Sequence, residues 1–169
     1  MTNALCGPSR AVIQTGKHSH LNGFMENEHR FDGSQQTFPK LLQKGGYQTA
    51  VIGKWHLGTD PQGYDFWKVL PGQGTYYAPD FRTPDGLVEG TPGEYVTEAV
   101  VTQSIEWLEK ERDQSKPFML MIQHKAPHRF WLPPVHLLDE YVAKDYPEPE
   151  NLFDDLSLIH ISEPTRRLV

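Results

Sequence analysis

Two short apolar segments, each followed at once by a cationic loop, constrain the fold of this 169-residue chain most strongly. The first segment, at 47–53, is centred on the sequence AVI, and the second is the continuous apolar run FMLMI at 118–122. Runs of this length are typical of strands covered on both faces. Between them, an amphipathic pattern at 94–112 predicts a helix. Its apolar face would comprise Val96, Ala99, Val100, Ile105 and Leu108.

This alternation of strand, helix and strand predicts an α/β fold with a mostly parallel sheet. A further short helix is predicted from Thr37, its expected N-cap, to the glycines at 45–46. The polar segment 19–34 is predicted to be a loop. From 60 to 93 the chain is rich in Gly, Pro and aromatic residues without a sustained period, which predicts a long surface excursion with a small hairpin. Its aromatic rings could stack on a sugar ring or pack onto the domain.

The composition limits the class of protein. The formal net charge of −6, with no compensating basic stripe, argues against nucleic acid as a partner. No apolar run approaches the length of a membrane span. A single cysteine excludes an internal disulfide. Met1 is followed almost directly by the first motif, so we expect no signal peptide within the chain.

That cysteine, Cys6, lies in the sequence CGPSR. Ser9 is a suitable N-cap for a helical turn that begins near Arg10, and Pro8 biases Gly7 toward extended backbone. Cys6 would then lie in a tight turn at a helix N-terminus, where backbone N–H groups and the helix dipole favour an anion. The alternative is a buried, inert cysteine, which suits this polar, cationic setting less well.

Each apolar segment leads into a cationic motif. After the first, the sequence GKWHLG contains Lys54 and His56, which would project to the same side of an extended backbone. A solvated lysine beside a core histidine is the alternative for this pair. After the second, the sequence QHKAPHR contains His124 and His128. These two histidines could bind a metal, but no matching carboxylate lies nearby in the sequence. Ligands of parallel sheets bind beyond the carboxyl ends of the strands, where both motifs fall.

Taken together, these motifs resemble the signatures of the sulfatase family. The sequence CGPSR, followed by Thr15 and Gly16, resembles the first signature, and GKWHLG resembles the second. The resemblance covers nearly all of 2–155 and implies an alkaline-phosphatase-like catalytic domain. Within the family, the sequences FDGSQQTFP, LPGQGTYY and HKAPHR most resemble the bacterial N-acetylglucosamine-6-sulfatase subgroup. The implied activity is hydrolysis of sulfate monoesters on sugars such as the N-acetylglucosamine 6-sulfate of glycosaminoglycan or mucin.

The resemblance also implies residue roles. The family converts the motif cysteine to formylglycine, whose aldehyde hydrate is the nucleophile, and binds calcium. The implied catalytic residues are Cys6, Arg10, Lys54, His56 and His128, and the implied substrate-binding residues are His124, Lys125 and Arg129. Cys6, as formylglycine, would also be a calcium ligand, but the carboxylate ligands of the family have no counterpart in this chain. A formylglycine-generating or sulfatase-maturing enzyme would be a partner, and the family's usual location is periplasmic, secreted or lysosomal.

Residues 1–155 are therefore expected to be part of a sulfatase catalytic domain, shortened at both ends. The segment from 156 back-translates into a sequence that resembles a transposase-based sequencing adapter, so 156–169 are interpreted as a non-native tail. Two alternative functions stay open. The chain could derive from a phosphonate or phosphate monoester hydrolase of the same superfamily, or it could be a catalytically inert fragment.

Overall fold

The computed structural model describes residues 3–140 and 142–151, so the interpretation of 156–169 as a tail falls outside the described residues. The chain divides into two units, Met1–Leu132 and Pro133–Val169. In the first unit, the helices and strands are α1 (Cys6–Thr15), α2 (Ser19–Asn22), α3 (Phe38–Lys44), β1 (Gln48–Lys54), β2 (Phe66–Leu70), β3 (Phe81–Thr83), β4 (Gly86–Val88), α4 (Val96–Glu106), the π-helix η1 (Trp107–Glu111) and β5 (Phe118–Gln123). In the second unit, the described residues contain the 3₁₀-helix η2 (Val135–Leu137).

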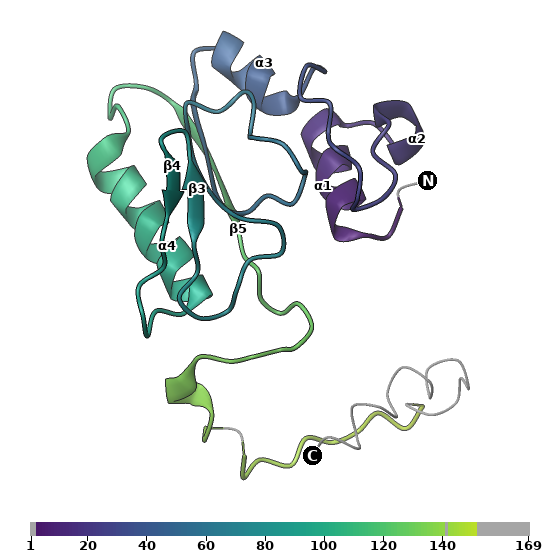
Figure 1. The fold of residues 1–169 in the computed structure, drawn as a ribbon, viewed down its shortest axis with the longest axis vertical. Coiled ribbons are helices and arrows are strands. Elements are labelled where there is room, and N and C mark those ends of the chain that lie inside the picture. The colour runs from purple at the N-terminus through teal and green to yellow at the C-terminus, as the bar shows by residue number, and fades with distance from the viewer. Residues whose placement is uncertain (1–2, 141, 152–169) are drawn as a thin grey trace. The chain divides into compact units, whose positions relative to one another are not determined.

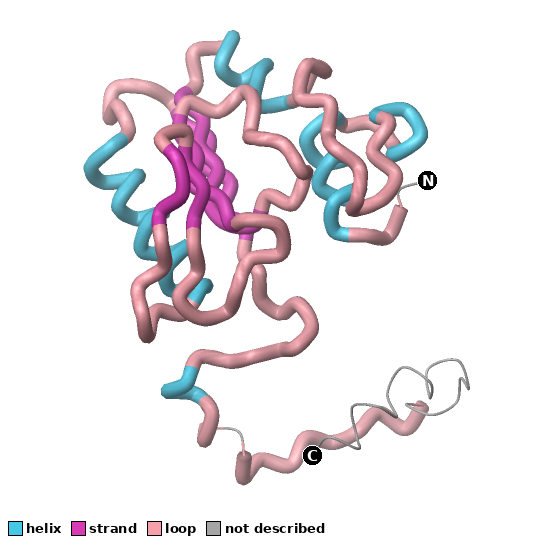
Figure 2. The backbone as a smooth tube through the Cα atoms, viewed as in Figure 1, coloured by secondary structure: helices cyan, strands magenta, loops and turns pink. Residues whose placement is uncertain are grey.

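One five-stranded sheet organises the first unit, with the strand order β4-β3-β2-β1-β5. Figure 2 shows its strands together in magenta. β1 pairs in parallel with both β2 and β5, whereas β2 with β3 and β3 with β4 are antiparallel. The predicted α/β fold with a largely parallel sheet is therefore confirmed. The carboxyl ends of the three parallel strands share one edge of the sheet, where bound ligands are expected.

Successive residues of β1 contribute to two different apolar clusters. Ala50 and Ile52 belong to a cluster with residues of α4, whereas Val51 belongs to a cluster with Ala11 of α1. Figure 1 shows α4 and α1 on opposite sides of the sheet. Because successive side chains of a strand point to opposite faces, the central residues 50–52 of β1 are all apolar, and the strand is buried from Thr49 onward. This confirms the prediction of a buried strand.

β2 corrects the prediction of an irregular excursion in this region. Its side chains alternate between the clusters, since Phe66 and Leu70 pack with one and Trp67 and Val69 with the other. Lys68 interrupts the apolar run, and aromatic residues and glycines on both sides hide the alternation in the sequence. This segment forms a strand because it pairs in parallel with β1, which the local sequence pattern does not show. The small hairpin that was expected is formed by β3 and β4.

β5 forms where predicted, and both of its faces contact apolar clusters, but none of its side chains is fully buried. Phe118 and Ile122 are 42% and 44% exposed, whereas the residues between them are partly buried. Within the described residues, β1 is the one strand that pairs with β5. β5 is therefore an edge strand, and an edge position explains the exposure.

α4 keeps its predicted position but differs in its apolar face. In its first two turns the predicted apolar residues Val96, Ala99 and Val100 are buried, and Leu108 is partly buried. Ile105 is 48% exposed, however, and Ser104 is buried in its place. Ser104 follows Val100 by one helical repeat, and its Oγ donates to the Val100 carbonyl at 2.7 Å. The prediction for Ile105 was wrong because this residue lies five positions after Val100, one position past the residue that falls on the buried face.

One short helix, α2, lies within the predicted polar loop at 19–34, and another, α3, follows it. α2 forms a single turn at its start, so the loop prediction was wrong there. α3 has the predicted N-cap, Thr37, and ends at Gly45 as predicted. None of the described helices combines the length and the apolar character needed to cross a lipid bilayer.

Candidate active site

α1 begins at Cys6, not near Arg10 as predicted. Leu5 is the N-cap, and Ser9 lies inside the helix, where its Oγ donates to the Leu5 carbonyl at 2.6 Å. Pro8 is tolerated in the first turn because the N–H groups there have no acceptor within the helix. The predicted extended backbone before Pro8 is therefore wrong. Cys6 lies at a helix N-terminus, as predicted.

The side-chain amides of two residues that are far apart in the sequence, Asn27 and Gln73, contact Cys6. Cys6 Sγ donates to Asn27 Oδ1 at 3.6 Å, and Gln73 Nε2 donates to Cys6 Sγ at 3.8 Å. Asn27 Oδ1 also accepts the Gly7 N–H at 2.9 Å. Since Asn27 occupies that N–H and Pro8 has none, the helix end does not offer the open set of N–H groups that the sequence suggested.

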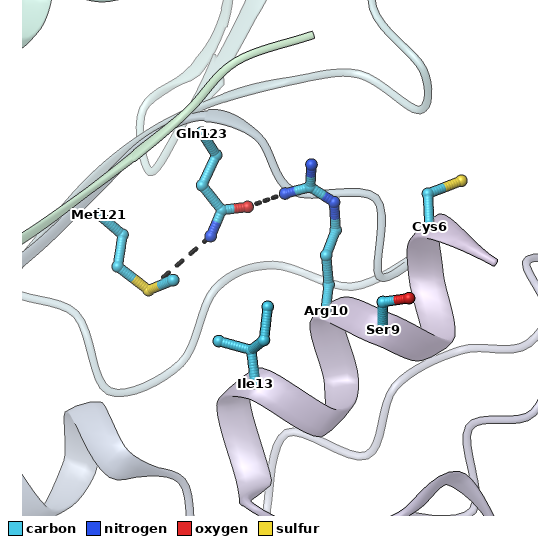
Figure 3. Close-up of a pocket in the computed structure, with 6 residues that line it drawn as sticks. All are labelled: Cys6, Ser9, Arg10, Ile13, Met121 and Gln123. Carbon is cyan, nitrogen blue, oxygen red and sulfur yellow. Dashed lines mark hydrogen bonds between the residues drawn. The ribbon is translucent and has the colours of Figure 1, made fainter. Parts of the chain in front are cut away.

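Further residues near Cys6 lie at or just after the carboxyl ends of the parallel strands. Lys54 is the last residue of β1, Gln123 is the last residue of β5, and Gln73 follows β2. Arg10 donates to the Lys54 carbonyl and to Gln123 Oε1. Figure 3 shows the Arg10 side chain extending from α1 toward Gln123. The helix that carries Cys6 is thus joined to the ends of two strands.

Gly53 permits the close approach of β1 and β5 at this edge. Its φ is +104°, and a Cβ atom there would lie 2.1 Å from the Gln123 carbonyl oxygen. A side chain would therefore force the strands apart. The glycine of the GKWHLG motif fixes the position of Lys54 relative to β5.

Cationic groups surround Cys6. Lys54 and Lys125 are only 3% and 7% exposed, and Arg10 is half-buried. The charge of Lys54 interacts with those of Cys6, Arg10 and Lys125. In the part of the chain that the structure describes, no carboxylate forms an ion pair with any of these three cations. The site therefore carries uncompensated positive charge, which favours an anionic ligand.

These charges and burial shift the pKa values of the site. Burial alone raises the pKa of the Cys6 thiol. The hydrogen bond from Gln73, the charge of Lys54 and the backbone N–H groups of Gly7 and Cys6 together outweigh burial and leave this pKa below its usual value. Burial lowers the pKa of Arg10, of Lys54 and of Lys125. For Lys54, Cys6 opposes this shift, whereas Arg10 and Lys125 add to it.

His56 adopts a left-handed backbone with φ 55°. The predicted extended geometry from Lys54 to His56 is therefore wrong, although both residues reach the same cluster. Burial, then the charges of Lys54, Arg10 and His128, lower the pKa of His56 to about 4. Its buried Nδ1 has no hydrogen-bond partner among the described residues. At neutral pH this imidazole is an uncharged proton acceptor.

His128 is oriented by its own loop. Its Nδ1 lies 2.9 Å from the Arg129 carbonyl, and because a carbonyl only accepts, Nδ1 carries the hydrogen. Nε2 is then the atom left for a ligand. The His128 carbonyl in turn accepts a hydrogen bond from the Tyr76 hydroxyl.

Two cavities adjoin the cluster. One, of about 340 Å³, is lined by Cys6, Ser9, Arg10, Ile13, Met121 and Gln123 (Figure 3). The other, of about 550 Å³, lies between the loop after β2 and the loop after β5. Its lining includes Gln73, Tyr76, Lys125, His128, Arg129 and Phe130.

The structure brings most, but not all, of the predicted residues together. Charge interactions connect Cys6, Arg10, Lys54, His56, Lys125 and His128. His124 is exposed and takes no part in these interactions, and Arg129 is exposed on the wall of the larger cavity. No group of three or more His, Cys, Asp or Glu side chains among the described residues could hold a metal ion.

Sequence reasoning missed three amide residues of the site, which are Asn27, Gln73 and Gln123. Asn27 lies in a segment predicted only as loop. Gln73 follows β2, and because β2 was not predicted, the return of the chain to Cys6 at this point was not predicted either. The available signal was the sequence PGQG after an alternating run, which is typical of a tight turn at a strand end.

Comparisons with known proteins agree with this arrangement. The sequence model of the sulfatase family matches residues 1–157. An N-acetylglucosamine-6-O-sulfatase of Bacteroides thetaiotaomicron is 54% identical over 156 residues, which cover 90% of this chain and 27% of the relative. An N-acetylglucosamine-6-sulfatase of Capra hircus is 31% identical over 153 residues, which cover 76% of this chain and 27% of the relative.

A solved structure gives the same result. The structure of BT4656 in complex with its substrate, D-glucosamine-2-N,6-O-disulfate, matches this chain with a TM-score of 0.85 and 52% identity, over 91% of this chain and 31% of that chain. This chain spans less than a third of the length of these proteins. The expected alkaline-phosphatase-like fold is confirmed. The chain belongs to the sulfatase family.

Proposed function

We propose that this chain carries the nucleophile of an enzyme that hydrolyses sulfate monoesters of sugars. The observation that supports this proposal is the uncompensated charge of Arg10, Lys54 and Lys125 beside Cys6. A sulfate ester is an anion whose oxygens accept hydrogen bonds from such groups. We propose further that residues 1–155 are part of a larger catalytic domain, since relatives are more than three times as long.

Cys6 is the residue that we propose to be converted to formylglycine, whose aldehyde hydrate supplies a hydroxyl nucleophile. Its surroundings fit an oxygen-bearing side chain, because Asn27 offers an acceptor and Gln73 a donor at Sγ. Conversion requires a maturing enzyme that recognises the CGPSR sequence, which is the protein partner in this proposal.

Calcium, the other group expected from the family, does not fit the described residues. It prefers about six to eight hard oxygen ligands, mostly carboxylates. The described residues near Cys6 offer amide oxygens and several cations, and none of their acidic side chains gather into a metal-binding group.

The geometry supports distinct roles for the site residues. Arg10 and Lys54 hold the sulfate group beside residue 6 and neutralise charge on its oxygens. His128, as an imidazolium whose Nδ1–H donates to the Arg129 carbonyl, gives its Nε2 proton to the departing sugar oxygen and becomes neutral, and Lys125 assists. His56 is uncharged and accepts a proton at its free Nδ1 from a hydroxyl of residue 6.

The larger cavity is the proposed site of the sugar. It adjoins Lys125 and His128, and Tyr76 and Phe130 add aromatic surface that can pack on a sugar ring. The name of the bacterial relative and the substrate of the solved complex share a glucosamine with sulfate at position 6. N-acetylglucosamine 6-sulfate is therefore the substrate that we propose. Arg129, which lines this cavity, and His124 are the further residues that we propose to bind it.

Paired substrates test this function. The full-length protein, matured so that residue 6 is converted, is assayed with N-acetylglucosamine 6-sulfate and with the matching 6-phosphate and a phosphonate ester. We expect faster release of sulfate, and no release of sulfate by Cys6→Ala. Faster hydrolysis of the phosphate or phosphonate ester would instead support the phosphonate or phosphate hydrolase. No turnover of any ester by converted protein would contradict both.

A further inference from the structure

Gln73 is held in a sharp turn after β2. The Gly74 N–H donates to the Pro71 carbonyl at 2.8 Å, and Gly72 and Gly74 have φ values of +52° and +68°. Such backbone angles favour glycine. Lys125 Nζ also donates to the Gln73 carbonyl at 3.0 Å. The backbone of Gln73 is thus fixed relative to the site before any ligand binds.

The two ends of the Gln73 amide differ in their contacts. Nε2 donates to Cys6 Sγ, whereas Oε1 is buried and has no hydrogen-bond partner among the described residues. Buried polar atoms nearly always have partners, so this oxygen requires an explanation. Because Oε1 is buried from solvent, a ligand in the neighbouring cavity does not reach it in this conformation.

A thiol at position 6 cannot supply the missing donor. Cys6 has one S–H hydrogen, and its Sγ donates to Asn27 Oδ1. Asn27 Oδ1 takes that single hydrogen, and Gln73 Oε1, which belongs to the same amide group as the Nε2 that contacts Cys6 Sγ, is left without one. A side chain with two hydroxyl groups at position 6 would satisfy both.

We propose that Asn27 and Gln73 form an amide pair that binds the hydrated aldehyde at position 6, each carbonyl oxygen accepting a hydrogen bond from one of its two hydroxyl groups. The inference rests on the proposed conversion of Cys6. Hydration adds one water across the aldehyde C=O. One hydrogen of the water bonds to the carbonyl oxygen, and the remaining hydroxyl group of the water bonds to the carbonyl carbon. The aldehyde has no O–H to donate, so the pair favours the hydrate over the aldehyde. Both amides are positioning residues, since they act through residue 6.

An aldehyde-selective probe tests this equilibrium apart from turnover. In the full-length, matured protein, an aminooxy compound labels the aldehyde at position 6, and the rate is normalised to the converted fraction given by the mass of the peptide that contains this residue. Gln73→Leu removes the acceptor. We expect labelling about fivefold to tenfold faster than in the wild type, as the loss of one hydrogen bond implies. We also expect kcat to fall by at least that factor, with a smaller change in KM.

Two variants separate this role from a general loss of structure. Gln103 is the matched control because its Oε1 is also buried without a partner among the described residues, but it lies on α4. Gln103→Leu should label at the wild-type rate. Gln73→Glu keeps a carbonyl-type acceptor, so its labelling should stay close to that of the wild type. Its negative charge should raise KM for the sulfate ester.

The outcomes also distinguish this inference from the proposed function. If Gln73→Leu and the wild type are both converted and label at equal rates, the amide pair is disproved, while the proposed function, sulfate ester hydrolysis, still stands. Equally fast labelling of Gln73→Leu and Gln73→Glu would also overturn the pair, because the acceptor would then not matter. If active wild-type protein contains only the thiol at position 6, both the inference and the proposed nucleophile fail.

Discussion

The guanidinium of Arg10 donates a hydrogen bond to the side-chain oxygen of Gln123, which lies 113 residues further along the chain. The same nitrogen, Nη1, also donates to the Lys54 carbonyl. One side chain therefore joins the helix that begins at Cys6 to the ends of β1 and β5. This connection orients the cationic cluster relative to residue 6.

Removal of the Gln123 acceptor should disturb the site without changing its charge. We expect Gln123→Leu to lower kcat/KM of the full-length protein about tenfold, because Arg10 loses one of the two acceptors that fix it. Gln43→Leu is the control, since Gln43 bonds to Asp65 on a different part of the fold. Equal kinetics of Gln123→Leu and the wild type would show that the connection does not orient Arg10.

Substitution of Gly53 should reduce stability through contact with β5. In Gly53→Ala the new Cβ would approach the Gln123 carbonyl oxygen to 2.1 Å, so we expect a loss of about 2 kcal/mol or more in the free energy of unfolding. Gly86 has a φ of +127° but open space around its Cβ position. Chemical denaturation of both alanine variants should therefore show the larger loss at position 53, and a larger loss at Gly86 would refute the steric explanation.

Lys54 should control the reactivity of the unconverted thiol. In protein made without the maturing enzyme, Lys54→Met removes a charge that lowers the pKa of Cys6. Less thiolate is then present near neutral pH, so alkylation by iodoacetamide should slow several-fold. The exposed Lys116 provides the control variant Lys116→Met, which should react at the wild-type rate. Unchanged alkylation of Lys54→Met would argue against the interaction between Lys54 and Cys6.

His56 should make the protein less stable in mild acid. Its pKa is about 4 in the folded chain, against 6.5 for the unperturbed group. Between these values the unfolded state binds more protons, so the contribution of His56 to stability is complete above the higher value and is lost as the pH falls toward the lower one. His56→Gln should show a smaller decrease in Tm from neutral pH to about pH 4.5. Exposed His124 offers the control His124→Gln, and an equal decrease in His56→Gln and the wild type would contradict the low pKa.

Much of the fold follows from local pattern, and the exceptions have physical causes. β1 is recognisable because both of its faces are covered, which makes its central residues, 50–52, a continuous apolar run. β2 was not recognised because Lys68 interrupts its apolar run and because its pairing with β1, the preceding strand, is a tertiary contact that the local pattern does not show. For α4, the helical repeat was the better guide, since it selects Ser104 over the more apolar Ile105. Edge exposure of β5 depends on sheet order, which local pattern does not contain.

The site shows the same division. Cys6, Arg10, Lys54 and His56 lie in motifs whose chemistry is visible in the sequence. Their surroundings are not visible, because Asn27, Gln73 and Gln123 reach Cys6 and Arg10 only through tertiary structure. The left-handed backbone of His56 also escaped the extended pattern that was assumed for it.

The mass of the peptide that contains residue 6, measured on full-length protein that hydrolyses a sulfate ester, tests the central claim most directly. The account predicts that the peptide carries formylglycine and that sulfate release increases in proportion to the converted fraction across preparations. Active protein in which this peptide contains only unmodified cysteine would contradict the account.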